Sequence, residues 1–176
     1  MSKAGGALLS IAVLLLVCTA GCGYHTAGKA NTLPTHINVL AVPTFVNHTH
    51  SYRVEQVFTS AVIRELTTRT QYKIVDEKND GTDAILHADI TQASSAPLTY
   101  DSQTGRATSG LITVTIQVSL VNNKGTVLFS NPNYTFREEY EITQEVSSFF
   151  DEESPALERM SRDMARSLVS NILEGF

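Results

Sequence analysis

A strict alternation of apolar and polar residues over positions 111–121 constrains the fold of this chain more than any other feature. The apolar positions are Ile112, Val114, Ile116, Val118 and Leu120, and the positions between them are Thr113, Thr115, Gln117 and Ser119. Side chains of a strand alternate between the two faces of a sheet, so the pattern predicts a strand with one buried face. A sheet with one apolar face must bury it against a second layer.

Two segments with apolar residues at helical spacing can supply that second layer. The first spans residues 51–70 and has its apolar side chains at Val54, Val57, Phe58, Ala61, Val62 and Leu66. The second spans residues 154–174 and has them at Leu157, Met160, Met164, Leu168 and Ile172. Ser51 is the predicted N-cap of the first helix. Ser154 with Pro155 predicts the start of the second, and Gly175 its C-cap.

Shorter apolar runs predict the other strands. They lie at residues 36–46, 72–75, 83–92 and 126–142, the last with a possible break at 131–133. The polar segment 93–110 predicts a hairpin tip, and the Asn-Asn-Lys-Gly sequence at 122–125 predicts a tight turn. Strand, helix and strand in succession favour a parallel crossover, and the later strands favour hairpins. We therefore predict an α+β fold, a two-layer α/β sandwich with a mixed sheet of four to five strands and both helices on one face.

The first residues predict export and a lipid anchor. Lys3 precedes an apolar run at 7–17, which is shorter than the roughly 20 residues of a membrane-spanning helix. Ala20-Gly21-Cys22 resembles a bacterial lipobox, although Thr19 stands where such motifs have an aliphatic residue, so an ordinary signal cleavage nearby stays open. We expect a signal peptide at 1–21 and a diacylglyceride and N-acyl lipid on Cys22. A tether at 22–35 would then lead to one domain at 36–176.

Charge and cysteine content exclude several classes of function. Loss of Lys3 from the 13 Lys and Arg residues leaves 12 against 18 Asp and Glu, which argues against nucleic acid as a partner. Cys18 leaves with the signal peptide and Cys22 carries lipid, so no thiol remains for a disulfide, a nucleophile or a metal. No cofactor is expected.

The residues predict no catalytic or metal site. His48 and His50 have the spacing of half a zinc site but lack a second pair of ligands. His87 and the pair Glu139 and Glu141 are interpreted as solvated strand residues. No nucleophile elbow or phosphate-binding glycine loop occurs in the sequence.

Two surfaces are candidate binding sites. The row Thr113, Thr115, Gln117 and Ser119 is polar but uncharged, which suits a hydrogen-bonding contact with another protein; the alternative is the ordinary strand preference of threonine. Arg106 and Lys124 lie at predicted hairpin tips, where cations can bind the phosphate groups of a lipid. The alternative for these two is solubilising loop charge.

Several short motifs, taken in order, resemble the LptE family of lipopolysaccharide-assembly lipoproteins. They are Gly21-Cys22-Gly23-Tyr24-His25, Leu33-Pro34, Ile37-x-Val39-x-Ala41-Val42-Pro43-x-Phe45-x-Asn47, Tyr52-x-Val54-Glu55, Asp83-Ala84-x-Leu86 and Glu139-Tyr140. The resemblance implies a two-layer α/β lipoprotein on the periplasmic side of the outer membrane. It further implies a plug and assembly partner of the β-barrel LptD that helps to deliver lipopolysaccharide to the outer leaflet. Arg106 is the best match to the family's basic lipopolysaccharide contacts, and residues 143–150 offer no second match.

Two other functions remain open from the sequence. The same lipobox and domain would suit an accessory lipoprotein of another envelope lipid transporter. The second of these alternatives is a hydrolase or metal protein built around His48 and His50.

Overall fold

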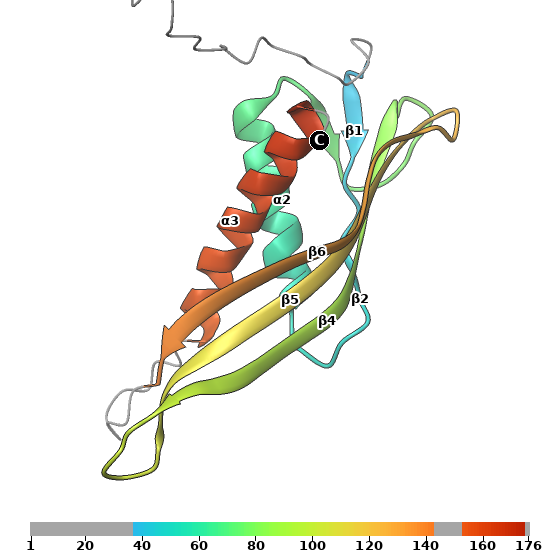
Figure 1. Cartoon of the computed structure of the whole chain (residues 1–176). Helices are drawn as coiled ribbons and strands as arrows, with labels where there is room; N and C mark the ends of the chain where they lie inside the picture. The colour runs from blue at the N-terminus through green and yellow to red at the C-terminus, as the bar shows by residue number, and fades with distance from the viewer. Residues whose placement is uncertain (1–36, 143–152, 175–176) are drawn as a thin grey trace, which may run out of the picture. The chain divides into compact units, whose positions relative to one another are not determined.

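The computed structural model describes residues 37–142 and 153–174 (Figure 1). Its elements, in order, are β1 (Val39–Ala41), β2 (Val46–Asn47), α2 (Val54–Arg69), β3 (Lys73–Val75), β4 (Ala84–Tyr100), β5 (Ala107–Asn122), β6 (Val127–Glu141) and α3 (Glu153–Glu174). The predicted signal peptide, Cys22, the tether and the C-cap Gly175 lie outside the described residues. Within them, no helix combines the length and apolarity that crossing a membrane requires.

The sheet is mixed, as predicted. Its strand order is β3-β1-β4-β5-β6, with β2 paired to β4. β1 runs parallel to both β3 and β4, which confirms the predicted crossover, whereas β4, β5 and β6 form an antiparallel meander. The sheet has six strands because the run predicted as one strand at 36–46 is two. Pro43, which has no N–H for a ladder hydrogen bond, lies in the interruption.

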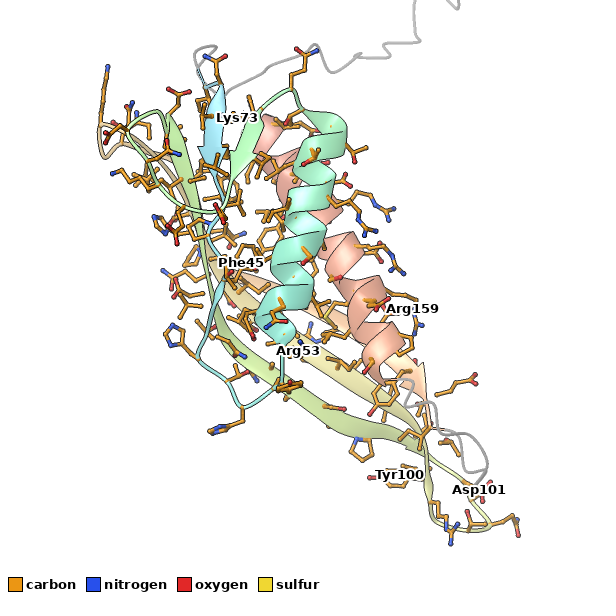
Figure 2. The ribbon with its side chains drawn as sticks, turned by 180° about the vertical axis from the view of Figure 1, so that it is seen from behind. Phe45, Arg53, Lys73, Tyr100, Asp101 and Arg159 are labelled. Atoms are coloured by element: carbon orange, nitrogen blue, oxygen red, sulfur yellow. The ribbon has the colours of Figure 1, made fainter. Side chains whose placement is uncertain are left out.

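Both helices cover the same face of this sheet, which confirms the two-layer prediction (Figures 1 and 2). The alternating positions of β5 supply buried side chains from Ile112 to Leu120, and β4 supplies Leu86, Ala88 and Ile90. The helix stripes meet them, with Phe58, Val62, Leu66, Met160, Met164, Leu168 and Ile172 all at most 2% exposed. The core therefore has two sides: helix residues that recur about every 3.6 positions, and strand residues that recur every 2 positions.

The helix starts differ from the predicted ones. α2 begins at Val54, and its N-cap is Arg53 in a left-handed conformation (φ 59°) with no capping side-chain bond. Ser51 belongs instead to the preceding loop, where its N–H donates to Thr49 Oγ1 and its carbonyl accepts from Asn47 Nδ2. α3 begins at Glu153, so Ser154 and Pro155 lie in its first turn, where a proline removes no intrahelical hydrogen bond.

The prediction of a hairpin tip spanning residues 93–110 is wrong. β4 continues to Tyr100 and β5 begins at Ala107, so only residues 101–106 form the tip. Hydroxyl groups bridge the neighbouring strands there, with Thr99 Oγ1 2.7 Å from Thr108 Oγ1 and 2.8 Å from Ser109 Oγ. The polar sequence of segment 93–110 predicts a loop, but the backbone hydrogen bonds between β4 and β5 do not require an apolar face.

Candidate protein and lipid contact surfaces

The predicted contact row of β5 lies on the face of the sheet that the helices leave uncovered, here called the outer sheet face. Gln117 is exposed, and Thr113, Thr115 and Ser119 are half-buried. On β4, Ser94 faces Thr113, Gln92 faces Thr115, Asp89 faces Gln117, and His87 faces Ser119. On β6, Arg137 faces Thr113, Thr135 faces Thr115, and Ser130 faces Ser119. The row is thus uncharged, while the strands on both sides of it carry charge.

Side-chain hydrogen bonds organise this face. Thr115 Oγ1 lies 3.1 Å from Thr135 Oγ1, and Thr91, at the bulge of β4, donates to the Thr115 carbonyl at 3.2 Å. Gln117, at the centre of the row, is exposed. Chemically it can form a wet, hydrogen-bonded contact with a polar surface.

Of the two histidines considered for metal binding, His48 contacts an aspartate and His50 is exposed in the same loop. His48 Nε2 lies 3.0 Å from Asp89 Oδ1, which ties the loop before α2 to the outer sheet face. Among the described residues, no group of three or more metal-binding side chains occurs.

Hydrogen bonds of Asp101 organise the β4–β5 tip that carries Arg106. Asp101 Oδ1 accepts from Thr104 N at 2.7 Å, Thr104 Oγ1 at 2.8 Å and Gln103 N at 3.0 Å. Asp101 N also donates to the Arg106 carbonyl at 2.8 Å, and Gly105 supplies the positive φ of 67° that the turn needs. These donors lower the pKa of Asp101, with the Thr104 backbone as the largest cause. Arg106 is therefore presented to solvent at the end of an ordered loop.

Arg106 and Lys124 lie at opposite ends of β5 and cannot contact the same phosphate group. Sixteen residues of β5 separate the two turns, which at about 3.3 Å per residue is roughly 50 Å. Figure 2 shows Tyr100 and Asp101 at the free end of the long hairpin, beyond the part of the sheet that the helices cover. Any lipid contact at the β4–β5 tip therefore involves Arg106 without Lys124.

The structure also shows two hollows that sequence reasoning missed. One, of about 250 Å³, opens at the N-terminal ends of the helices, where Tyr52, Val54, Ile112, Val114 and Leu157 line it. Tyr52 is 83% exposed there. The first residues of α2 and the middle of β5 come together only in the folded chain, so no local motif signals this pocket.

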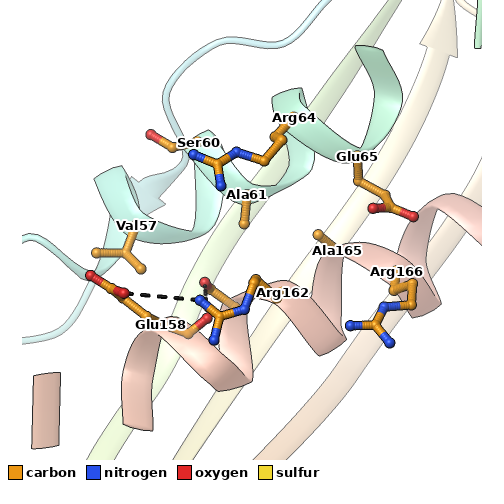
Figure 3. A pocket seen from close by; sticks show the side chains of 10 residues that line it. Val57, Ser60, Ala61, Arg64, Glu65, Glu158, Arg162, Ala165 and Arg166 are labelled. Carbon is orange, nitrogen blue, oxygen red and sulfur yellow. Dashed lines mark hydrogen bonds and ion pairs between the residues drawn. The ribbon is translucent and has the colours of Figure 1, made fainter. Parts of the chain in front are cut away.

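The second hollow is a groove of about 300 Å³ between the solvent sides of α2 and α3, here called the inter-helix groove (Figure 3). Val57, Ala61 and Ala165 form its apolar part, and Arg64, Arg162 and Arg166 are its cations. The four-residue spacing of Glu158, Arg162 and Arg166 is the one sequence signal that could have indicated a charged helix face.

Comparisons with known proteins agree with this geometry. The model of the family LptE, described as lipopolysaccharide-assembly, matches residues 37–172. No curated protein sequence matches the chain. The solution structure of an uncharacterized lipoprotein B from Nitrosomonas europaea is similar with a TM-score of 0.55 and 16% identity, over 78% of this chain and 83% of that one. A hypothetical protein of Chlamydia trachomatis is similar with a TM-score of 0.51 and 11% identity, over 80% and 97% of the two chains. At these identities the two structures support the fold alone.

Proposed function

The chain belongs to the lipopolysaccharide-assembly family LptE, and from that membership we propose that it is a non-enzymatic plug and assembly partner of an LptD-like β-barrel in the outer membrane. In this role it helps to deliver lipopolysaccharide to the outer leaflet. The family match over residues 37–172 is the observation that carries the proposal, since it spans every described element almost to the end of α3.

The outer sheet face is the proposed contact with the barrel. The lumen of a large outer-membrane barrel is polar, so a plug needs a surface that exchanges hydrogen bonds with water for hydrogen bonds with the barrel wall. Thr115 and Gln117 lie in the uncharged central row of this face and can enter such a contact without desolvating a charge. Asp89 and Arg137 flank the row and would fix its orientation.

The β4–β5 tip is the proposed contact with lipopolysaccharide. A guanidinium group binds phosphate through two parallel hydrogen bonds, and the ordered tip leaves Arg106 free to do so. The pocket beside Tyr52 is lined by apolar side chains such as Ile112 and Leu157 and by three serines, and its apolar side offers a place for part of an acyl chain. Lys124 lies at the far end of β5 and is proposed only as a separate, weaker contact.

A lipid on Cys22 is the proposed anchor, and it places the domain on the periplasmic side of the outer membrane. Gly23, the residue after the lipidated cysteine, is consistent with that membrane, because an aspartate at this position tends to retain lipoproteins at the inner membrane.

A tagged pull-down from detergent-solubilised envelope, followed by mass spectrometry, tests the proposal. We expect a large β-barrel protein in equal amount to the tagged chain. Recovery of an inner-membrane transporter instead would favour the hypothesis that the chain is an accessory lipoprotein of another envelope lipid transporter. Recovery of the chain alone would leave the proposed barrel role without support.

A further inference from the structure

We propose that the inter-helix groove binds a helical segment of a partner protein that presents acidic side chains. The groove lies on the helical layer, on the opposite side of the domain from the outer sheet face (Figures 1 and 3). A partner seated there binds a different surface from the proposed barrel contact, so the inference goes beyond the proposed function.

The shape of the groove suits a helix. α2 and α3 run side by side, with the ends of both near Arg69, whose Nη1 donates to Ser170 Oγ at 2.6 Å. Two adjacent helices form a long furrow between them, into which the side-chain ridge of a third helix can pack. Ala61 and Ala165 line this furrow, and their small side chains let a third backbone approach closely.

The cations of the groove are available to a partner. Within the described residues, Arg64 takes part in no ion pair, and Arg162 Nη1 lies 3.9 Å from Glu158 Oε2, too far for a hydrogen bond. Arg166 is 3.2 Å from Asp163, but both side chains are about two-thirds exposed. Exposed pairs of this kind contribute little free energy, so a partner's carboxylate can displace them. Figure 3 shows Arg64 and Arg162 extending into the groove from different helices.

The mixed lining favours a protein segment over a lipid headgroup or a free anion. Glu65 and Glu158 also line the groove and would repel a phosphate group that sits deep between the arginines. A helix can place its acidic side chains against Arg64, Arg162 and Arg166 and keep them away from the two glutamates. The apolar part at Val57 and Ala61 then buries an aliphatic side chain of the same helix, which a free anion lacks.

Site-specific photo-crosslinking tests the inference with the full-length chain in its own envelope. A photo-reactive amino acid replaces Ser60, an exposed residue that lines the groove, and the crosslinked peptide is sequenced. We expect a peptide with acidic residues at helical spacing from another protein. Arg64→Glu should lower the crosslink yield about tenfold or more, through loss of a charge-assisted hydrogen bond. Reversing one acidic residue of the crosslinked segment to Arg should restore it.

Two further variants separate the roles of charge and shape. Ala61→Trp leaves every charge in place but fills the furrow, and it should also abolish the crosslink. Lys78→Glu makes the same charge change on an exposed loop and should leave the yield unchanged. Thermal unfolding of each variant checks that the domain is folded.

Crosslinks to lipid, to a second copy of this chain or to a non-helical segment would overturn the inference. So would the absence of a crosslink, or a yield that Arg64→Glu does not change. The same photo-reactive group at Gln117 reports contact with the barrel independently, so failure at the groove and failure of the proposed function are distinguishable.

Discussion

The ring of Tyr140 lies over Gly110 so closely that a Cβ on Gly110 would stand 2.5 Å from Tyr140 Cζ. The two residues are cross-strand partners on β5 and β6, and the Tyr140 hydroxyl reaches Ser95 Oγ on β4 at 2.9 Å. One aromatic side chain thus crosses three strands where the sheet begins to leave the cover of the helices. A glycine is required beneath it because any side chain would occupy the space of the ring.

Replacing Gly110 should therefore destabilise the domain. We expect Gly110→Ala to lower the free energy of unfolding by about 1–3 kcal/mol, because the ring must move and leave Ser95. Denaturant unfolding measures the change. Most of the loss should disappear when the same substitution is made in a Tyr140→Ala background. Gly81→Ala is the control, since its Cβ would meet Asn79 Oδ1 at an ordinary 3.5 Å.

A buried hydrogen bond between the first strands and α2 gives a second prediction. Thr59 Oγ1 accepts from Phe45 N at 3.0 Å, and Thr59 is 6% exposed. Thr59→Val keeps the shape but leaves the Phe45 N–H without its acceptor, which should cost about 1–3 kcal/mol of unfolding free energy. Thr59→Ser retains the oxygen and should lose much less. Equal stability of the Val and Ser variants would show that the hydrogen bond contributes nothing.

The outer sheet face predicts how barrel binding can be disturbed without unfolding the domain. Thr115→Arg and Gln117→Arg each place a long cation in the uncharged central row, where a close contact would bury it unpaired. We expect co-purification of the barrel to fall severalfold while the melting temperature changes little. Thr67→Arg makes the same exchange on the exposed side of α2 and serves as the control. Normal co-purification of the two sheet variants would remove this face from the interface.

The predicted anchor is tested by its attachment residue. Cys22→Ser should abolish incorporation of labelled fatty acid, because the thiol that carries the lipid is then absent. Thr19→Leu should leave incorporation intact or increase it. Continued labelling of the Cys22→Ser chain would place the lipid elsewhere.

The β4–β5 tip should be sensitive to acid in a defined range. The pKa of Asp101 is lowered in the folded chain by the donors of Thr104 and Gln103, so the ionised carboxylate stabilises the tip. That contribution is present above the ordinary pKa of 3.8 and is lost as the pH falls through the lower folded value. Amide NMR signals of Gln103 and Thr104 should report the loosening. In Asp101→Ala the same signals should be shifted already at neutral pH.

Most of the core could be predicted because it depends on local periodicity. The alternation around Val114 and Ile116 and the helical stripe through Met160 and Met164 assign each side chain to a face, whatever the final topology. The position of Thr115 and Gln117 on the outer sheet face also followed, as a prediction, from this alternation. The length of the β4–β5 hairpin did not, because Ser95 and Thr99 owe their strand conformation to partners on β5 and β6.

The sequence by itself determined the layers: which stretches become helices or the central parts of the strands, which side of each is buried, and the residue types that the sheet leaves facing outward. These features follow from interactions between residues a few positions apart. Only the tertiary structure decided what depends on distant residues. It set Tyr140 over Gly110, separated Arg106 from Lys124 by the length of β5, and brought Arg64 and Arg162 to one groove. Such juxtapositions arise from strand register and helix packing, which bring together residues far apart in the chain and leave no periodic signal in it.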